Sequence, residues 1–279
     1  MSIKEFTFSE KECANTLLDF IALKLDSSKK RAKRLLDKRL VFVNKKRIWI
    51  ASHILKRGDK VEVIAEGIKA SVFHKDAILY EDNYYLIVAK SPNILTNGPR
   101  SLEDMLKKRF GDNRIQAVHR LDKDTSGAVI FARSKEAFEH LKNLFKKNLV
   151  KKIYRVLVKG QLETQLFTIN TSIHGQNAVT HVKVIKSSKY ASYLEVNIET
   201  GRTHQIRVHL ASIGHPVVGE AEYDRKPVEI SRLRSVPRQM LHAYKVSFNH
   251  PYTLKLVSVT AKVPDDFSQC LRCCSLYMI

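Results

Sequence analysis

The chain has 279 residues, enough for one large domain or for an ordinary domain with a small module. Hydrophobic residues make up 44% and charged residues 28%, which excludes disordered, collagen-like and disulfide-framework proteins. Lysine and arginine number 49 against 28 aspartate and glutamate residues, so the formal net charge is +21. An excess of this size attracts polyanions, and nucleic acid is the foremost candidate partner.

The apolar runs and the cysteines indicate the cellular compartment of the protein. No apolar run approaches the roughly 20 residues that span a bilayer, and the N-terminus mixes charges where a signal peptide would be apolar. Cys13 stands alone, while Cys270, Cys273 and Cys274 crowd the C-terminus, a pattern unsuited to a disulfide scaffold or a zinc site. We expect a cytoplasmic protein with reduced thiols and no membrane partner.

Residues 1–65 are expected to form a small α/β module. Apolar residues recur at spacings of three and four between residues 17 and 25, which predicts a helix there. A second helix follows the capping candidates Ser27 and Ser28 and extends to about residue 36. Short strands are expected over residues 40–43, 48–50 and 61–64, the last after a Gly-Asp turn.

The charge of this module is concentrated in one stretch. Between Lys29 and Arg47 there are ten basic residues and one acid, Asp37. A solvated helix face is the alternative, but such faces usually carry both signs. The order of two helices, a hairpin around Asn44 and the Gly-Asp turn resembles the S4 RNA-binding domain, which implies RNA as the partner. The residues expected to bind RNA are Lys29, Lys30, Arg31, Lys33, Arg34, Lys45, Lys46 and Arg47.

Residues 66–279 predict a larger α+β body. Residues 66–76 are expected to link it to the module, and a buried strand follows over residues 84–89. Helices are predicted from Ser101, from near Ser134 and over about residues 203–212. Strands are predicted over residues 128–132, 153–158, 181–185, 193–198 and 255–259. They outnumber the helices without regular βαβ alternation, which favours a mixed α+β fold.

The densest polar segment outside the module is HRLDKDTSG, residues 119–127, directly before a predicted strand. A loop that leads into a buried strand is a rigid mount for reactive groups, although a solvated turn is the alternative. The segment resembles the signature of the RluA-type pseudouridine synthases. Three further segments match the family in its order: KIY at 152–154 with VKG at 158–160, GRTHQIRVH at 201–209, and LHA at 241–243.

The resemblance implies the pseudouridine synthase fold, with a central, mainly antiparallel mixed sheet and a catalytic cleft. It also implies that the protein isomerises uridine in RNA: the glycosidic bond is cut, the uracil turns, and its carbon 5 is joined to the sugar. No atoms enter or leave, so no cofactor and no metal are expected. Ribosomal RNA of the large subunit is the implied target, with transfer RNA left open, and the family expectation is a monomer.

The resemblance also assigns roles to residues. Asp122 is implied as the carboxylate that manages the electron-poor anomeric carbon. Arg202 is implied as the guanidinium that orients Asp122, and Tyr154 as the ring that packs on the uracil. The substrate contacts are His119, Arg120, which fills the gap left by the extruded base, and Leu241, which lies beneath the uracil.

Two alternatives to this assignment are open. His204, His209 and His215 could suggest a metal site, but no carboxylate or cysteine is spaced to complete it, so structural roles are expected. The chain could also be a non-catalytic RNA-binding or ribosome-assembly factor on the same fold. The presence of Asp122, Arg202 and Tyr154 together argues against a retired site, which would be free to lose any of them.

Overall fold

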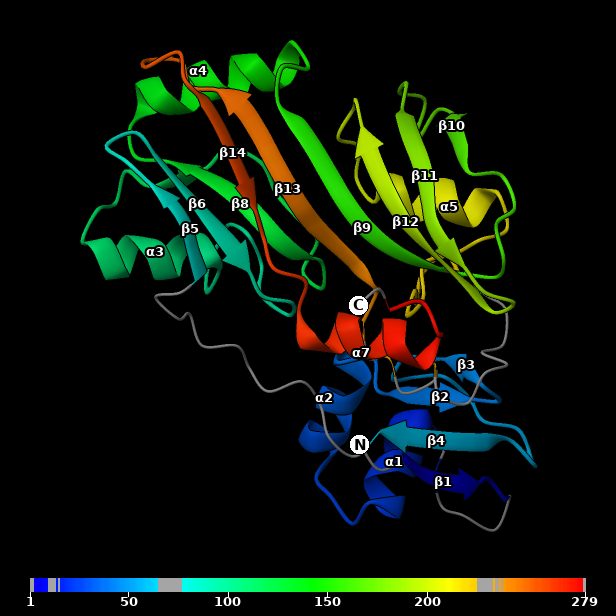
Figure 1. The fold of residues 1–279 in the computed structure, drawn as a ribbon. Helices are drawn as coiled ribbons and strands as arrows, with labels where there is room; N and C mark the ends of the chain where they lie inside the picture. Colours follow the sequence, from blue (N-terminus) through cyan, green and yellow to red (C-terminus); the bar gives the residue numbers. More distant parts are fainter. Residues whose placement is uncertain are drawn as a thin grey trace. The chain divides into compact units, whose positions relative to one another are not determined.

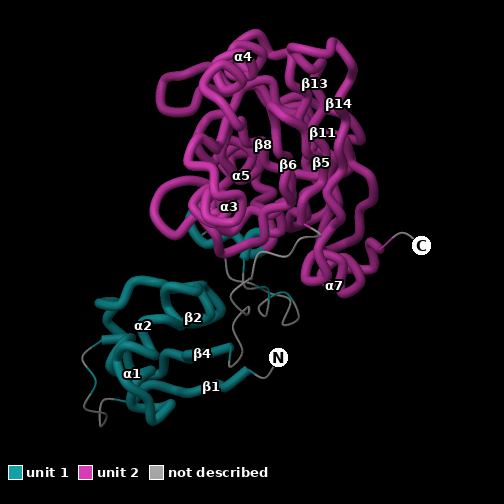
Figure 2. Tube along the Cα trace, turned by 90° about the vertical axis from the view of Figure 1, so that its left-hand side faces the viewer, with its two compact units in different colours: residues 1–69, 219–239 teal, residues 70–218, 240–279 magenta. Residues whose placement is uncertain are grey.

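The computed structural model describes residues 3–9, 14, 16–64, 77–224, 233, 236 and 238–277 (Figure 1). Contacts divide the chain into two compact units: residues 1–69 with 219–239, and residues 70–218 with 240–279 (Figure 2). The expected module boundary at residues 65 and 66, the expected linker at 66–76, and Cys13 lie outside the described residues. None of the helices in the described ranges is both long and apolar enough to cross a bilayer.

Within the described part of residues 3–64, the first unit contains helices α1 and α2 and a four-stranded sheet in the order β1-β4-β2-β3. The helices are α1 (Leu17–Lys24) and α2 (Lys29–Asp37), and the Ser28 hydroxyl caps α2 by accepting the Arg31 N–H. The strands are β1 (Ile3–Thr7), β2 (Val41–Val43), β3 (Lys46–Arg47) and β4 (Lys60–Ile64).

The hairpin of this unit differs from the sequence prediction. Asn44 and Lys45 both have positive φ angles, 48° and 67°, as a tight two-residue turn requires. The return strand therefore starts at Lys46, and the strand predicted over residues 48–50 is wrong. Strand β1, which pairs antiparallel with β4, was not predicted from the sequence.

The second unit is built on a ten-stranded sheet in the order β10-β11-β12-β9-β13-β8-β6-β5, with β14 paired to β13 and β7 to β8. Among the paired strands described here, β8 and β13 run parallel and the others antiparallel, which confirms the expected mixed sheet. The strands are β5 (Ile78–Glu81), β6 (Tyr85–Lys90), β7 (Gln116–Ala117), β8 (Ser126–Ala132), β9 (Lys151–Lys159), β10 (Leu166–Asn170), β11 (Val179–Ser187), β12 (Ala191–Ile198), β13 (Leu241–Asn249) and β14 (Leu256–Thr260).

Both faces of the middle strands are buried. Successive side chains of a strand point to opposite faces, so Leu86 and Val88 of β6 enter one core while Tyr85 and Ile87 enter the other. The first core is covered by α3 (Leu102–Phe110) and α5 (Gln205–Ser212), and the second by α4 (Lys135–Lys146). This is why the sequence shows a continuous apolar run there instead of an alternating one.

The serines predicted near helix starts are N-caps. The hydroxyl of Ser101 accepts the Asp104 N–H, and the hydroxyl of Ser134 accepts the Ala137 N–H. Helix α7 (Asp265–Cys273), which was not predicted, follows β14 and carries free cysteine thiols.

The parallel contact between β8 and β13 requires a glycine. Gly127 lies opposite Ala243, and its φ of +121° belongs to the region that side chains avoid. A Cβ atom on Gly127 would lie 2.2 Å from the Ala243 carbonyl oxygen. Next to this contact, the Ser126 hydroxyl lies 2.9 Å from Nδ1 of buried His242. The end of the HRLDKDTSG segment is thereby fixed against β13.

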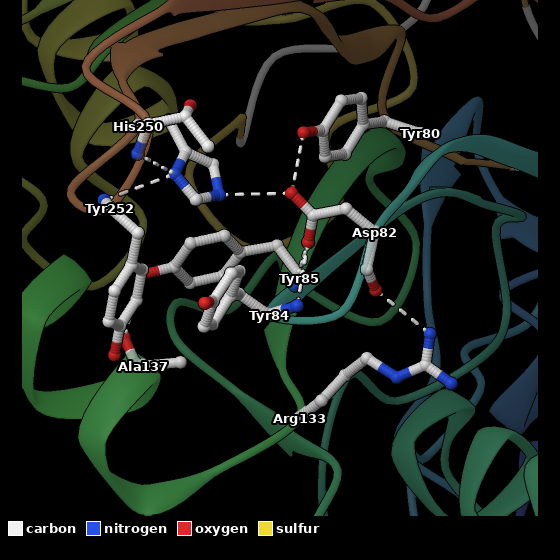
Figure 3. A network of polar contacts seen from close by, with 9 residues as sticks. Tyr80, Asp82, Tyr84, Tyr85, Arg133, Ala137, His250 and Tyr252 are labelled. Carbon is white, nitrogen blue, oxygen red and sulfur yellow. Dashed lines mark hydrogen bonds and ion pairs between the residues drawn. The ribbon is translucent and has the colours of Figure 1, made fainter.

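A polar network joins the β5–β6 hairpin to the turn after β13 (Figure 3). Asp82 accepts the Tyr80 hydroxyl at 2.6 Å and two backbone N–H groups at the start of β6. Nε2 of the buried His250 lies 2.9 Å from the Asp82 carboxylate. Burial alone would raise the pKa of Asp82, but these hydrogen bonds and His250 together hold it below its ordinary value.

Candidate active site

The HRLDKDTSG segment lies in the loop between β7 and β8, and its backbone is anchored on both sides of Asp122. The Thr96 hydroxyl donates to the Leu121 carbonyl and accepts the Leu121 N–H, each at 3.0 Å. The buried Lys90 ammonium donates to the Lys123 carbonyl at 2.9 Å and to two carbonyls of its own loop. The loop that carries Asp122 is therefore held by side chains from residues 90–96.

His119 supports the same loop as a neutral imidazole. Its Nε2 accepts the Ile130 N–H at 3.1 Å, and its ring packs on Phe145 with centroids 5.2 Å apart. Burial, with a smaller effect of the Lys152 charge, lowers the pKa of His119 to about 3. His119 is not among the residues that line the pocket around Asp122, and its substrate contact stays a prediction.

Asp122 pairs with an arginine other than the expected one. Nη1 of Arg207, on α5, lies 3.3 Å from Oδ2 of Asp122, and the Arg207 side chain is 3% exposed. Arg202 instead donates its Nε to the Asn177 carbonyl at 3.1 Å, so the prediction that Arg202 orients Asp122 is wrong. The physical reason is that α5 begins at Gln205: Arg202 lies in the turn before the helix, whereas Arg207 is carried by it.

Gln205, which the sequence analysis did not single out, organises that turn. Its Oε1 accepts the Arg202 N–H at 3.0 Å and the Thr200 hydroxyl at 2.7 Å. Its Nε2 donates to the Val179 carbonyl at 2.9 Å and lies 3.0 Å from the Thr180 hydroxyl. All hydrogen-bonding directions of the buried amide are used, so Gln205 fixes α5, and with it Arg207, against β11.

His204 is a further neighbour of Asp122 that the sequence analysis assigned to structure alone. It caps α5 with a left-handed backbone, φ +56°, and its half-buried ring places Nε2 3.7 Å from Oδ1 of Asp122. His209, by contrast, has a structural role as predicted: it hydrogen-bonds the Thr180 hydroxyl and the Thr171 carbonyl. Within the described ranges, no three histidine, cysteine or acidic side chains are grouped to hold a metal.

An open pocket surrounds Asp122. Tyr154 of β9 and Leu241 of β13 form part of its wall and are 7% and 4% exposed. Arg120 and Arg202 also line it. Burial, and then the Asp122 charge, raise the pKa of Tyr154, so the phenol is protonated at neutral pH. A flat, uncharged ring fits this combination of apolar wall, neutral phenol and carboxylate.

The basic residues of the first unit are mostly on its surface. Lys30, Arg31 and Arg34 of α2 are exposed, as are Lys45 and Lys46 of the hairpin. Two other lysines of the predicted set are exposed but form ion pairs: Lys29 with Asp19 at 2.7 Å and Lys33 with Asp37 at 2.9 Å.

Arg47 does not belong to the RNA-binding set. Its side chain is buried, and the guanidinium donates to the carbonyls of Gly219 and Val236. It also lies over the Phe42 ring, 4.9 Å from the centroid. The prediction that Arg47 contacts RNA is therefore wrong, because the side chain is buried and both terminal nitrogens donate within the unit. A charge count along the sequence could not distinguish it from its exposed neighbours.

Comparisons with known proteins agree with this architecture. A family model described as RNA pseudouridylate synthase matches residues 84–212, and an S4 domain model matches residues 16–61. A Bacillus subtilis protein described as an uncharacterized RNA pseudouridine synthase is 33% identical, with 96% of each chain covered. Ribosomal large subunit pseudouridine synthase C of Escherichia coli O157:H7 is 28% identical, with 97% of this chain and 96% of the relative covered.

Solved structures give the same result for the fold. The human RNA pseudouridylate synthase domain containing 4 protein superposes with a TM-score of 0.63 at 22% identity, over 73% of this chain and 94% of that one. The human domain containing 1 protein gives a TM-score of 0.58 at 28% identity, over 71% and 86%. The residues that the family model matches include the Asp122 loop, β9 and α5. The chain belongs to the RNA pseudouridine synthases and carries an S4 domain before the synthase fold.

Proposed function

We propose that Asp122 is the carboxylate that acts at the anomeric carbon of a uridine extruded from RNA into the pocket around it. The bond between uracil N1 and the sugar C1′ breaks, and a bond between C5 and C1′ forms. The proton on C5 leaves to solvent and N1 gains one, so atoms and charge balance. Attack of the carboxylate on C1′ and proton removal from the sugar are alternative routes, and both require an ionised Asp122.

The observation that carries this proposal is the pair of Asp122 and Arg207 at the pocket. The guanidinium holds the carboxylate in one orientation while leaving its other oxygen available. Tyr154, neutral and part of the wall, is placed to pack on the uracil ring and to supply or pass a proton. Arg120 is exposed at the same pocket, where it can occupy the space that the extruded base leaves in the RNA.

We also propose ribosomal RNA of the large subunit as the target, with transfer RNA as the competing candidate. Support comes from relatives that are described as ribosomal large subunit pseudouridine synthases and from the exposed basic face of the S4 domain. A cytoplasmic location is part of this proposal, because that is where the protein would meet ribosomal RNA. We also propose that the protein acts as a monomer.

The test uses RNA labelled with tritium at uracil C5, since joining C5 to the sugar releases that hydrogen to solvent. Purified wild-type protein should release tritium from such RNA. The Asp122→Asn variant, nearly isosteric but without the anionic oxygen, should release less than about 1% of the wild-type amount while binding the RNA with unchanged affinity. Near-normal release by this variant would remove Asp122 from the mechanism, and binding without release by the wild type would favour a non-catalytic factor.

Pseudouridine mapping identifies the target. Stable RNAs from cells with and without the gene are mapped, and the proposal expects missing modifications in large-subunit ribosomal RNA. Loss of sites in transfer RNA alone would reassign the substrate without changing the chemistry.

A further inference from the structure

A second groove opens beside the Asp122 pocket. Arg120, Tyr154 and Arg202 line both the groove and the pocket, so the two adjoin each other. The far wall of the groove is made by the last turns of α4 and the start of β9, and it includes Lys142 and Lys152. We call it the lysine groove.

The lining of the lysine groove is strongly positive. Five of its side chains are basic, namely Arg120, Lys142, Lys146, Lys152 and Arg202, and a single acid, Glu199, lies among them. The Glu199 carboxylate is already 2.6 Å from Nε2 of His181. Lys142 and Lys146 are four residues apart, so they project from the same face of α4 on successive turns.

Lys152 gives the strongest indication that the groove binds an anion. Its ammonium lies over the Phe145 ring, 5.5 Å from the centroid, and burial lowers its pKa. In the described part of the chain no carboxylate forms an ion pair with Lys152, and its charge acts unfavourably on neighbouring His119. Partial burial of an unpaired ammonium costs folding free energy. An anion that binds in the groove would offset this cost, which would explain why a lysine lies at this position.

An RNA whose target base enters the pocket would bring its own phosphate groups to the groove, and these are anions. We propose that the lysine groove is a binding subsite for the RNA backbone next to the target uridine, where Lys142, Lys146 and Lys152 hold a phosphodiester group. This inference rests on the proposed function, because it assumes that the target nucleoside occupies the Asp122 pocket. It explains how extrusion of the base is stabilised: the strand beside the opened position is held by charge, which needs no particular base sequence.

The first test compares two pairs of substitutions on one helix. Lys142→Gln with Lys146→Gln removes two charges from the groove. Lys135→Gln with Lys147→Gln removes two exposed charges, at the first residue and the C-cap of α4, that do not line it. Both pairs are made in the Asp122→Asn background, and the dissociation constants for large-subunit ribosomal RNA and for transfer RNA are measured across salt concentrations.

The groove pair should raise the dissociation constant of the bound RNA about tenfold and lower the salt slope by about one. The control pair should change the dissociation constant less than about twofold. Equal weakening by both pairs would reduce the groove to part of the general positive charge and overturn the proposal.

The second test uses neighbouring residues of β9. Lys151 and Lys152 point to opposite faces of the strand, and Lys151 is exposed outside the groove. Lys152→Gln should weaken RNA binding about tenfold while leaving the melting temperature unchanged or raised, because an unpaired partly buried charge is removed. Lys151→Gln should change neither. A lower melting temperature with unchanged RNA binding would show that Lys152 serves the fold and would overturn the proposal.

Kinetics separate this inference from the proposed function. In the otherwise wild-type protein, the groove pair should raise KM for tritium-labelled RNA about tenfold with kcat changed less than about twofold. Absence of tritium release from the wild type would reject the proposed function, and the binding comparisons in the Asp122→Asn background would still decide whether the groove holds RNA.

Discussion

Arg207 and Asp122 form an ion pair across 3.3 Å, with the guanidinium buried and the carboxylate partly open to the pocket. The pair joins α5 to the loop before β8, two elements that are 85 residues apart in the sequence. The two side chains differ in burial: the arginine is fixed in the core, and the aspartate is partly exposed toward the pocket. This arrangement predicts different consequences for the two arginines of the GRTHQIRVH segment.

Arg207→Gln should lower kcat for tritium release by at least about 100-fold, because the carboxylate loses the charge that orients it. Arg202→Gln should act mainly on KM, since Arg202 lines the pocket without contacting Asp122. Steady-state kinetics on labelled RNA separate the two effects. A larger loss of kcat in the Arg202 variant than in the Arg207 variant would contradict the assignment. Arg207→Lys, which keeps the charge but not the planar geometry, should recover part of the activity.

His119 predicts a loss of stability in mild acid. Its pKa is about 3 in the folded protein and near 6.5 in the unfolded chain, so the unfolded state binds the proton more tightly. The contribution is complete above pH 6.5 and is lost as the pH falls toward 3, at a limiting slope of about 1.4 kcal/mol per pH unit. Urea unfolding of the wild type and of His119→Gln between pH 7 and pH 4.5 measures it. The two curves should converge as the pH falls, and parallel curves would exclude His119 as the cause.

The close contact at Gly127 predicts that any side chain at this position destabilises the fold. Gly127→Ala places a methyl group against the Ala243 carbonyl oxygen in the β8–β13 contact and imposes an unfavourable φ. We expect a loss of about 3 kcal/mol in the free energy of unfolding. Gly201→Ala is the matched control, because a Cβ atom at Gly201 meets no heavy atom within 4 Å. Thermal unfolding of the two variants gives the comparison, and similar melting temperatures would argue against the close strand approach.

The Asp82 network predicts a second loss of folding stability in acid, at a lower pH than the loss caused by His119. The folded-state pKa of Asp82 is lower than the ordinary 3.8, so its contribution is present above 3.8 and is lost as the pH falls through the folded value. Asp82→Asn should cost about 2 kcal/mol at pH 7 because it weakens the bond from Tyr80 and the contact with His250. The difference from the wild type should shrink below pH 3.8. Denaturant titrations at pH 7, 4 and 3 test this order.

The exposed face of α2 predicts a role in RNA affinity. Lys30→Gln with Arg34→Gln removes two exposed charges one helical turn apart, and Lys56→Gln with Arg57→Gln removes the same two residue types from a loop of the same unit. The α2 pair should weaken RNA binding and flatten its salt dependence by one to two units of slope, roughly one per lost phosphate contact. An unchanged slope would mean that this face does not contact phosphate.

The parts of the fold that the sequence predicts are those with a local signal. Ser28, Ser101 and Ser134 each precede an apolar helical pattern, and each is an N-cap. The buried strand over residues 84–89 and the strand before α4 were likewise evident from their continuous apolar runs. Strand β1 escaped prediction because it is largely exposed and lacks a clean alternation. Helix α7 escaped it because its N-cap residue is a proline, which supplies no side-chain cap.

The candidate site shows what a linear motif leaves open. Arg202 and Arg207 belong to one segment, and only the start of α5 at Gln205 decides which of them reaches Asp122. A local signal for Arg207 does exist: it lies beside Ile206 and three residues before Leu210, both of which are in the core. An arginine on the apolar side of a helix needs a buried partner. Arg47 was misassigned for the same reason, since burial is set by contacts that are remote in the sequence.

The ammonium of Lys90 bonds three carbonyl oxygens, two in its own loop and one in the loop of Asp122. Two segments that are remote along the chain therefore unfold locally as one. Their amide hydrogens should exchange with deuterium at similar rates, and Lys90→Met, which removes these three hydrogen bonds, should speed the exchange in both segments together.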